Sequence, residues 1–111
     1  MLEDVLDSLS GLLANKQGRG TPPWAAEVCS VSRDAMHFIV IAPPGQEDMK
    51  RAEDLFQKAL DLIDPDHPAM GKRHRNIRMR LTNLRHLMAG EPLEQFRPEN
   101  AGDCMPVPGG V

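Results

Sequence analysis

The run Met36-His37-Phe38-Ile39-Val40-Ile41-Ala42 decides the predicted fold. It is apolar and rich in β-branched residues, and Pro43-Pro44-Gly45 stops it, which together predict a buried strand. A strand needs a neighbour for its backbone groups. Residues 27–33 are therefore expected to form the second strand of a hairpin, with its turn at Arg33-Asp34-Ala35.

The stretch of residues 21–32 also has a helical interpretation. Thr21-Pro22-Pro23 could cap and start a helix, with Trp24, Val28 and Val31 on one face. We predict a strand here, because residues 28–32 suit a pleated surface. A two-stranded hairpin alone is marginally stable in water, so either helices cover one face or two chains pair their hairpins. That requirement predicts a homodimer.

Three amphipathic helices are predicted around this hairpin. Residues 2–14 place apolar side chains at steps of three and four, which makes one stripe on a 3.6-residue period. Residues 46–63 and 71–89 carry two further stripes. Asp64-Pro65-Asp66-His67-Pro68 separates them, because neither proline can continue a helix. The predicted fold class is therefore α+β in the order helix, strand, strand, helix, helix, with the hairpin packed on the amphipathic helices.

Length and composition predict one domain with a tail. The 111 residues fit a single domain over residues 1–96, and residues 97–111 are expected to be flexible and disordered. An acidic N-terminus and short apolar runs indicate neither a secretory signal nor a membrane span, so we expect a cytoplasmic protein. Cys29 and Cys104 are too few for a disulfide framework, and Cys104 is expected to be an exposed thiol with incidental reactivity.

Charge divides between the last two predicted helices. Residues 47–66 hold seven acidic residues against three cations, whereas residues 67–90 hold six cations and no acidic residue. With Ile77 at the centre of the buried stripe, these cations surround an apolar seam and do not form one flat basic face. We predict a partner-binding site along this seam. Its residues are Lys72, Arg75, Arg78, Arg85, Ile77, Leu81, Leu84 and Met88.

The predicted function follows from the seam. We expect a non-catalytic protein–protein interaction module (adaptor, chaperone-like or regulatory protein) whose arginines select an acidic partner. The alternative is a nucleic-acid-binding regulator that uses residues 71–89, because guanidinium groups pair well with phosphate oxygens. The protein partner ranks first, since no aromatic residue lies between the cations to stack on bases and the net charge is −3. No membrane binding is expected, because anionic lipid would repel the acidic face of residues 2–14.

Catalytic and metal-binding patterns are weak. The histidines lie in separate contexts, and no paired Cys-x-x-Cys or Gly-rich phosphate loop occurs. Cys29 with His37 as its base is a candidate nucleophile pair, although a cysteine in a strand is more often a small buried hydrophobe. Asp64, Asp66 and His67 could bind a hard cation, but a calcium loop needs more oxygens at set spacing. We expect no enzyme activity and no cofactor.

One segment resembles a known repeat family. Ala52-x3-Phe56-x2-Ala59-Leu60, followed by Leu62 and Asp64-Pro65, resembles the second helix and closing proline of a tetratricopeptide repeat. The resemblance covers residues 49–68, about a sixth of the chain. It implies a peptide-binding adaptor.

Overall fold

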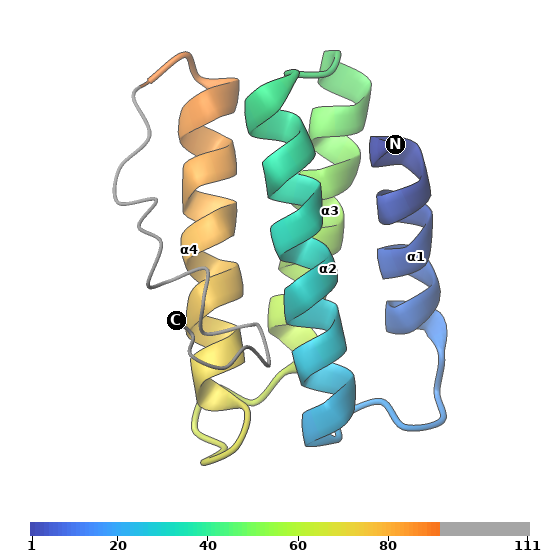
Figure 1. Ribbon diagram of the computed structural model, residues 1–111. Helices are drawn as coiled ribbons and strands as arrows, with labels where there is room; N and C mark the ends of the chain where they lie inside the picture. Colours follow the sequence, from blue (N-terminus) through green and yellow to red (C-terminus); the bar gives the residue numbers. More distant parts are fainter. Residues whose placement is uncertain (92–111) are drawn as a thin grey trace, which may run out of the picture.

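The computed structural model describes residues 1–91 and consists there of four helices without a strand (Figure 1). The helices lie side by side, alternate in direction and place α1 and α4 on opposite sides of the bundle (Figure 1). The predicted tail at residues 97–111, with Cys104, lies outside the described residues. The bounds of the helices are α1 (Leu2–Ala14), α2 (Pro22–Ile41), α3 (Gln46–Leu62) and α4 (Gly71–Met88).

The predicted hairpin is wrong, and with it the α+β fold class. Both predicted strands and the turn between them lie within the single helix α2. The described part of the chain is therefore all-α, and the argument for a homodimer from unpaired hairpins no longer applies. The Pro43-Pro44-Gly45 stop does end an element, but that element is a helix.

Two features of the sequence make residues 22–41 helical. Thr21 caps the helix, because its Oγ1 accepts the Trp24 backbone N–H at 3.4 Å, and Pro22 and Pro23 occupy first-turn positions that need no N–H donor. The buried positions then recur at helical steps, so packing outweighs the weak β preference of Ile39-Val40-Ile41. The buried residues of α2 are Trp24, Ala25, Val28, Cys29, Ser32, Ala35, Met36 and Ile39.

The three predicted amphipathic helices are confirmed as α1, α3 and α4. The broken segment between α3 and α4 also packs tightly. A Cβ atom added to Gly71 would lie 2.7 Å from the Pro65 carbonyl oxygen, so the first residue of α4 must be glycine for this approach. Gly90 ends α4 with φ of 75°, the left-handed conformation that favours glycine.

All four helices contribute to one core. Phe56 of α3 is fully buried among apolar side chains of the other helices. Polar contacts fix the outer edges: Trp24 Nε1 donates to the Leu12 carbonyl at 2.9 Å, and Arg51 Nη2 lies 2.6 Å from Asp7 Oδ1. The largest fully buried side chains include Leu6, Leu9, Met36, Ile39, Ile63, Ile77, Leu81 and Leu84.

The cap at Thr21 gives a direct test of the helical assignment of α2. Thr21→Ala removes an N-cap side chain and is expected to lower the free energy of unfolding by about 0.5–2 kcal/mol. The matched control is Thr82→Ala, because Thr82 lies on the exposed face of α4 and its Oγ1 only donates to the Arg78 carbonyl behind it. Urea denaturation should show a lower free energy of unfolding for Thr21→Ala and no decrease for Thr82→Ala. Equal stability of the two variants would contradict the cap.

Candidate functional site

The four apolar residues of the predicted seam do not share one environment. Ile77, Leu81 and Leu84 are at most 2% exposed and belong to the core between the helices. Met88, near the end of α4, is 37% exposed. A partner therefore has no access to three of the four seam positions in this structure.

The four cations of the predicted site lie on the outer side of α4, but one of them is paired. Lys72, Arg75 and Arg78 are exposed, follow each other at steps of three, and form no ion pair with another described residue. We call these three residues the basic stripe. Arg85 is different, because its Nε donates to Glu53 Oε2 at 2.9 Å. Arg85 thus fastens α4 to α3.

This pairing shifts the acid–base behaviour of Glu53. The hydrogen bond from Arg85 and a second one from Lys50 hold the pKa of Glu53 below its ordinary value of 4.5. A carboxylate whose pKa is lower in the folded protein than in the unfolded chain stabilises the fold at pH values above its ordinary pKa. That contribution is lost as the pH falls below 4.5 and through the lower folded pKa.

The candidate nucleophile pair does not assemble. Cys29 is fully buried, and Arg80 Nη1 donates to its carbonyl at 3.3 Å and to its sulfur at 3.2 Å. The same Arg80 nitrogen donates to Ser32 Oγ at 3.3 Å, which makes a buried polar link between α4 and α2. His37 is exposed on the same helix as Cys29, about 12 Å further along its axis. Cys29 is thus neither a free thiol nor accessible to a substrate.

The candidate cation ligands form turn contacts instead. Asp64 Oδ1 accepts the Asp66 backbone N–H at 2.9 Å, and His67 Nδ1 accepts the Ala69 N–H at 3.0 Å. Among residues 1–91, no three His, Cys, Asp or Glu side chains are grouped as metal ligands would be. No described helix combines the length and the apolar character needed to cross a membrane.

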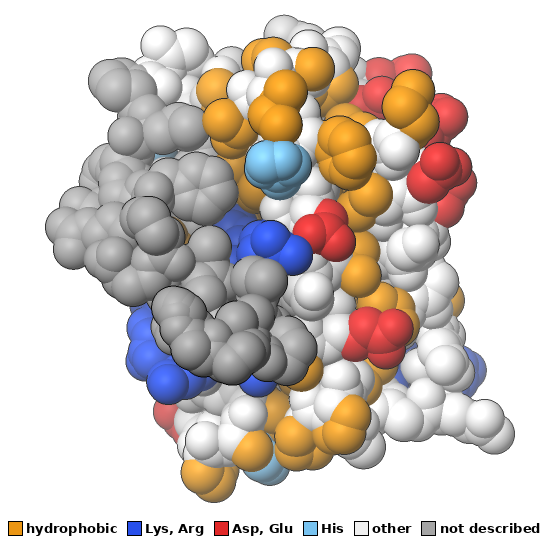
Figure 2. Space-filling model, viewed as in Figure 1, with side chains coloured by type: hydrophobic (Ala, Val, Ile, Leu, Met, Phe, Trp, Pro, Cys, Tyr) orange, Lys and Arg blue, Asp and Glu red, His pale blue; other side chains and the backbone are white. Residues whose placement is uncertain are grey.

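A surface that sequence reasoning missed lies at one end of the bundle. The start of α1 and the ends of α2 and α4 meet there (Figure 1). Figure 2 shows hydrophobic side chains gathered around this end of α2. The exposed large apolar residues are Met1 (82%), Phe38 (37%), Val40 (38%), Ile41 (65%) and Met88 (37%). Together with Pro44 in the α2–α3 connection we call them the apolar end.

The strand assignment hid this surface. A buried strand would enclose Phe38, Val40 and Ile41, whereas a helix through the same residues turns them away from the buried positions Met36 and Ile39. The helical spacing of buried residues earlier in α2 was the signal that could have revealed it.

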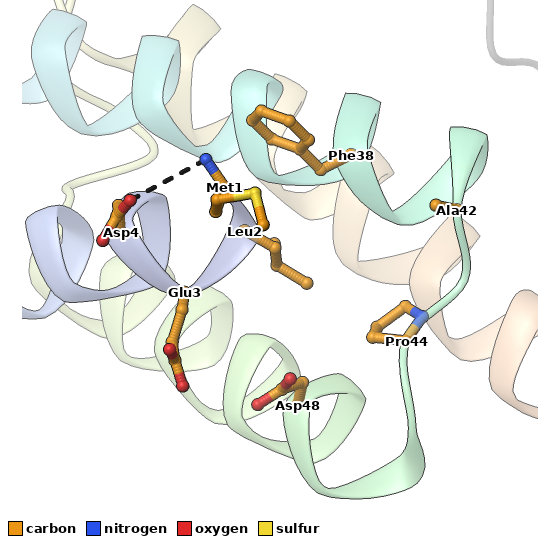
Figure 3. Close-up of a pocket in the computed structure, with 8 residues that line it drawn as sticks. All are labelled: Met1, Leu2, Glu3, Asp4, Phe38, Ala42, Pro44 and Asp48. Carbon is orange, nitrogen blue, oxygen red and sulfur yellow. Dashed lines mark ion pairs between the residues drawn. The ribbon is translucent and has the colours of Figure 1, made fainter.

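Two neighbouring hollows open at the apolar end. The larger has a volume of about 440 Å³ and lies between α1, the end of α2 and the start of α3 (Figure 3). The smaller, about 280 Å³, lies between Pro44, Met49 and Met88. Pro44 lines both, so the apolar surface continues from α1 to α4. The larger hollow is lined by Met1, Leu2, Glu3, Asp4, Phe38, Ala42, Pro44 and Asp48.

Three carboxylates border the larger hollow. Glu3 and Asp48 lie on one side of it and Phe38 on the other (Figure 3). Neither Glu3 nor Asp48 forms an ion pair with another described residue, and Asp4 lies 3.8 Å from the amino group of Met1. We call Glu3, Asp4 and Asp48 the acidic rim. The arrangement offers apolar contact beside negative charge.

Comparisons with known proteins do not place the chain in a family. No protein-family model matches it, and no curated protein or solved structure matches it significantly. The fold and the surface therefore define a class only: a small all-α bundle with an exposed apolar end.

The Arg85–Glu53 pair gives a test of the α3–α4 contact. Arg85→Gln removes the charged donor, so the pKa of Glu53 is expected to rise toward its ordinary value. Arg75→Gln is the matched control, because Arg75 has no ion-pair partner among the described residues. NMR titration of the Glu53 carboxyl should show the rise in the first variant alone. The same pKa in both variants would rule out the pairing.

Proposed function

We propose that this chain is a non-catalytic protein–protein interaction module, an adaptor, chaperone-like or regulatory protein, and that it binds its partner through the apolar end. The observation that supports this most is the gathering of large exposed apolar side chains at one end of a bundle. Single exposed apolar residues are normal on a protein surface, whereas a continuous apolar patch is typical of an interaction site.

The fold itself does not require these side chains. The core of the described residues is already closed around Phe56, Leu6 and Ile77, which are fully buried. Phe38 and Ile41 extend beyond it, at 37% and 65% exposure. Fully burying a large apolar side chain gains about 1.5–3 kcal/mol relative to leaving it exposed. A partner that covers these residues obtains the part of that gain that corresponds to the surface still exposed in the isolated chain.

The proposal relocates the apolar contact predicted from sequence. Met88 of the predicted seam belongs to the apolar end, whereas Ile77, Leu81 and Leu84 act in the core. The tetratricopeptide-repeat resemblance of residues 49–68 implies the same class of function, a peptide-binding adaptor. We place this activity in the cytoplasm, as the sequence predicts.

A second candidate function is nucleic-acid binding by the basic stripe. Lys72, Arg75 and Arg78 are exposed on one side of α4 and lack ion-pair partners among the described residues, which supports contact with a polyanion. The acidic protein partner predicted from the sequence would meet this same surface. Nucleic-acid binding ranks second because no exposed aromatic side chain lies beside the stripe on α4.

The first candidate is tested at Ile41, the most exposed residue of α2 at the apolar end. Ile41→Glu places a charge among the exposed apolar side chains at the end of α2 and is expected to weaken partner binding at least about tenfold, as at an interface hot spot. Gln17→Glu introduces the same charge at the other end of the bundle and serves as the control (Figure 1). Proteins retained from native extract by each variant are identified by mass spectrometry, and the affinity of the purified partner is then measured.

The outcome is read from the two variants together. A partner that binds the unaltered chain and the Gln17→Glu variant equally, and the Ile41→Glu variant weakly, supports the proposal. The proposal fails if every retained protein binds the Ile41→Glu variant as well as it binds the unaltered chain.

The second candidate is tested by charge reversal in the basic stripe. Arg75→Glu with Arg78→Glu is expected to abolish binding to duplex DNA, and binding by the unaltered chain should fall log-linearly with salt concentration. The Ile41→Glu variant is the control, because it leaves the stripe intact. Binding that does not respond to salt or to the reversal would contradict nucleic-acid recognition.

A further inference from the structure

We propose that the occupant of the apolar end is a cationic amphipathic helix belonging to the partner protein. This inference rests on the proposed function, because it names the chemistry of the segment that the apolar end receives. Its two arguments are the shape of the apolar surface and the charge beside it.

The shape favours an elongated apolar face. The two hollows share Pro44 and together reach from Leu2 of α1 to Met88 of α4. The bundle measures 35 × 31 × 24 Å, and a helix of 12–18 residues is about 18–27 Å long. Such a helix spans the end of the bundle and can set apolar side chains one or two turns apart into the two hollows. This is the geometry of an amphipathic helix bound in a groove.

The charge beside the larger hollow selects a cation. Glu3 and Asp48 have no ion-pair partner among the described residues. The carboxylate of Asp4 has one long contact, 3.8 Å, with the amino group of Met1. Figure 2 shows acidic side chains over the first part of α1. At the α4 side, Arg85 is already paired with Glu53. The apolar end is therefore bordered by negative charge that its own cations do not neutralise.

The helix dipoles leave this charge nearly unchanged. At the apolar end α1 and α3 begin, with about +0.5 of an elementary charge each, and α2 and α4 end, with about −0.5 each, so the four contributions nearly cancel. Glu3, Asp4 and Asp48 each carry a full negative charge at neutral pH. With the single amino group of Met1 included, the surroundings of the hollow approach neutrality only when Lys or Arg side chains of an occupant lie over the rim.

The same charges disfavour the other occupants. Two copies that met end to end would bring one acidic rim against the other, which is repulsive. The basic stripe of a second copy matches the rim in charge, but α4 buries Ile77, Leu81 and Leu84 and has no large exposed apolar side chain beside the stripe to place in the hollows. An anionic membrane surface would be repelled by Glu3 and Asp48.

The experiment uses two designed 18-residue helices of defined composition, one of leucine and lysine and one of leucine and glutamate, with identical leucine positions. Binding of each labelled peptide to the full chain is measured by fluorescence anisotropy at low salt. The variants are Glu3→Lys with Asp48→Lys, the milder Glu3→Gln with Asp48→Asn, and Ile41→Ser. Asp66→Lys is the matched control, because it changes one carboxylate in the same way at the far end of the bundle.

The leucine–lysine helix is expected to bind, and the leucine–glutamate helix to bind at least about tenfold more weakly. Reversal of the rim should lower affinity for the leucine–lysine helix at least about tenfold and raise affinity for the leucine–glutamate helix. A variant that gains affinity must be folded, so this exchange separates recognition from misfolding. Neutralisation of the rim should give a smaller loss of about threefold, and Asp66→Lys should leave binding unchanged.

Three results would overturn the inference. If Ile41→Ser weakens binding of both peptides while the rim variants change neither, the apolar end is a docking surface without a preference for cations, and only this inference fails. If binding of both peptides is indifferent to Ile41→Ser, the proposed function fails as well. If sedimentation equilibrium shows a dimer that Ile41→Ser dissociates, a second copy is the occupant.

Discussion

The bundle depends on the burial of one face of α2. This helix packs against α1 through Trp24 and against α4 through Arg80, and it contributes eight buried residues to the core. The helical period then determines where every other side chain of α2 lies. Near its end, Met36 and Ile39 face inward, so Phe38 and Ile41 must face solvent. The exposed apolar end is thus a geometric consequence of how α2 is buried.

The amphipathic helices could be predicted because their signals are local. Leu6, Leu9 and Leu13 recur at helical steps within one short segment, and the prolines at positions 65 and 68 mark the break between α3 and α4. The region of α2 was harder, because Ile39-Val40-Ile41 favours a strand by composition while the packing of the whole helix favours the other conformation. Burial in the folded bundle determines which conformation forms. In the sequence alone, the helical spacing of Val28, Ser32 and Ala35 is the only sign of that burial.

The surfaces of the folded bundle could not be predicted from the sequence, for a physical reason. Helix projection identifies which side of α4 is apolar, but it does not tell whether other helices already cover that side. Ile77 and Leu84 are covered, while Lys72 and Arg75 remain on the surface. Likewise the acidic rim unites residues from the starts of α1 and α3, which only the folded bundle brings to one place.

The position of Trp24 makes it an optical reference. It is the only tryptophan of the chain, it is 5% exposed, and its indole N–H is held by the Leu12 carbonyl at the end of the bundle opposite the apolar end. Its emission therefore reports whether α1 and α2 remain joined, while events around Ile41 and Pro44 take place beyond its surroundings. Intrinsic fluorescence can follow the integrity of this molecule separately from the occupancy of its far end.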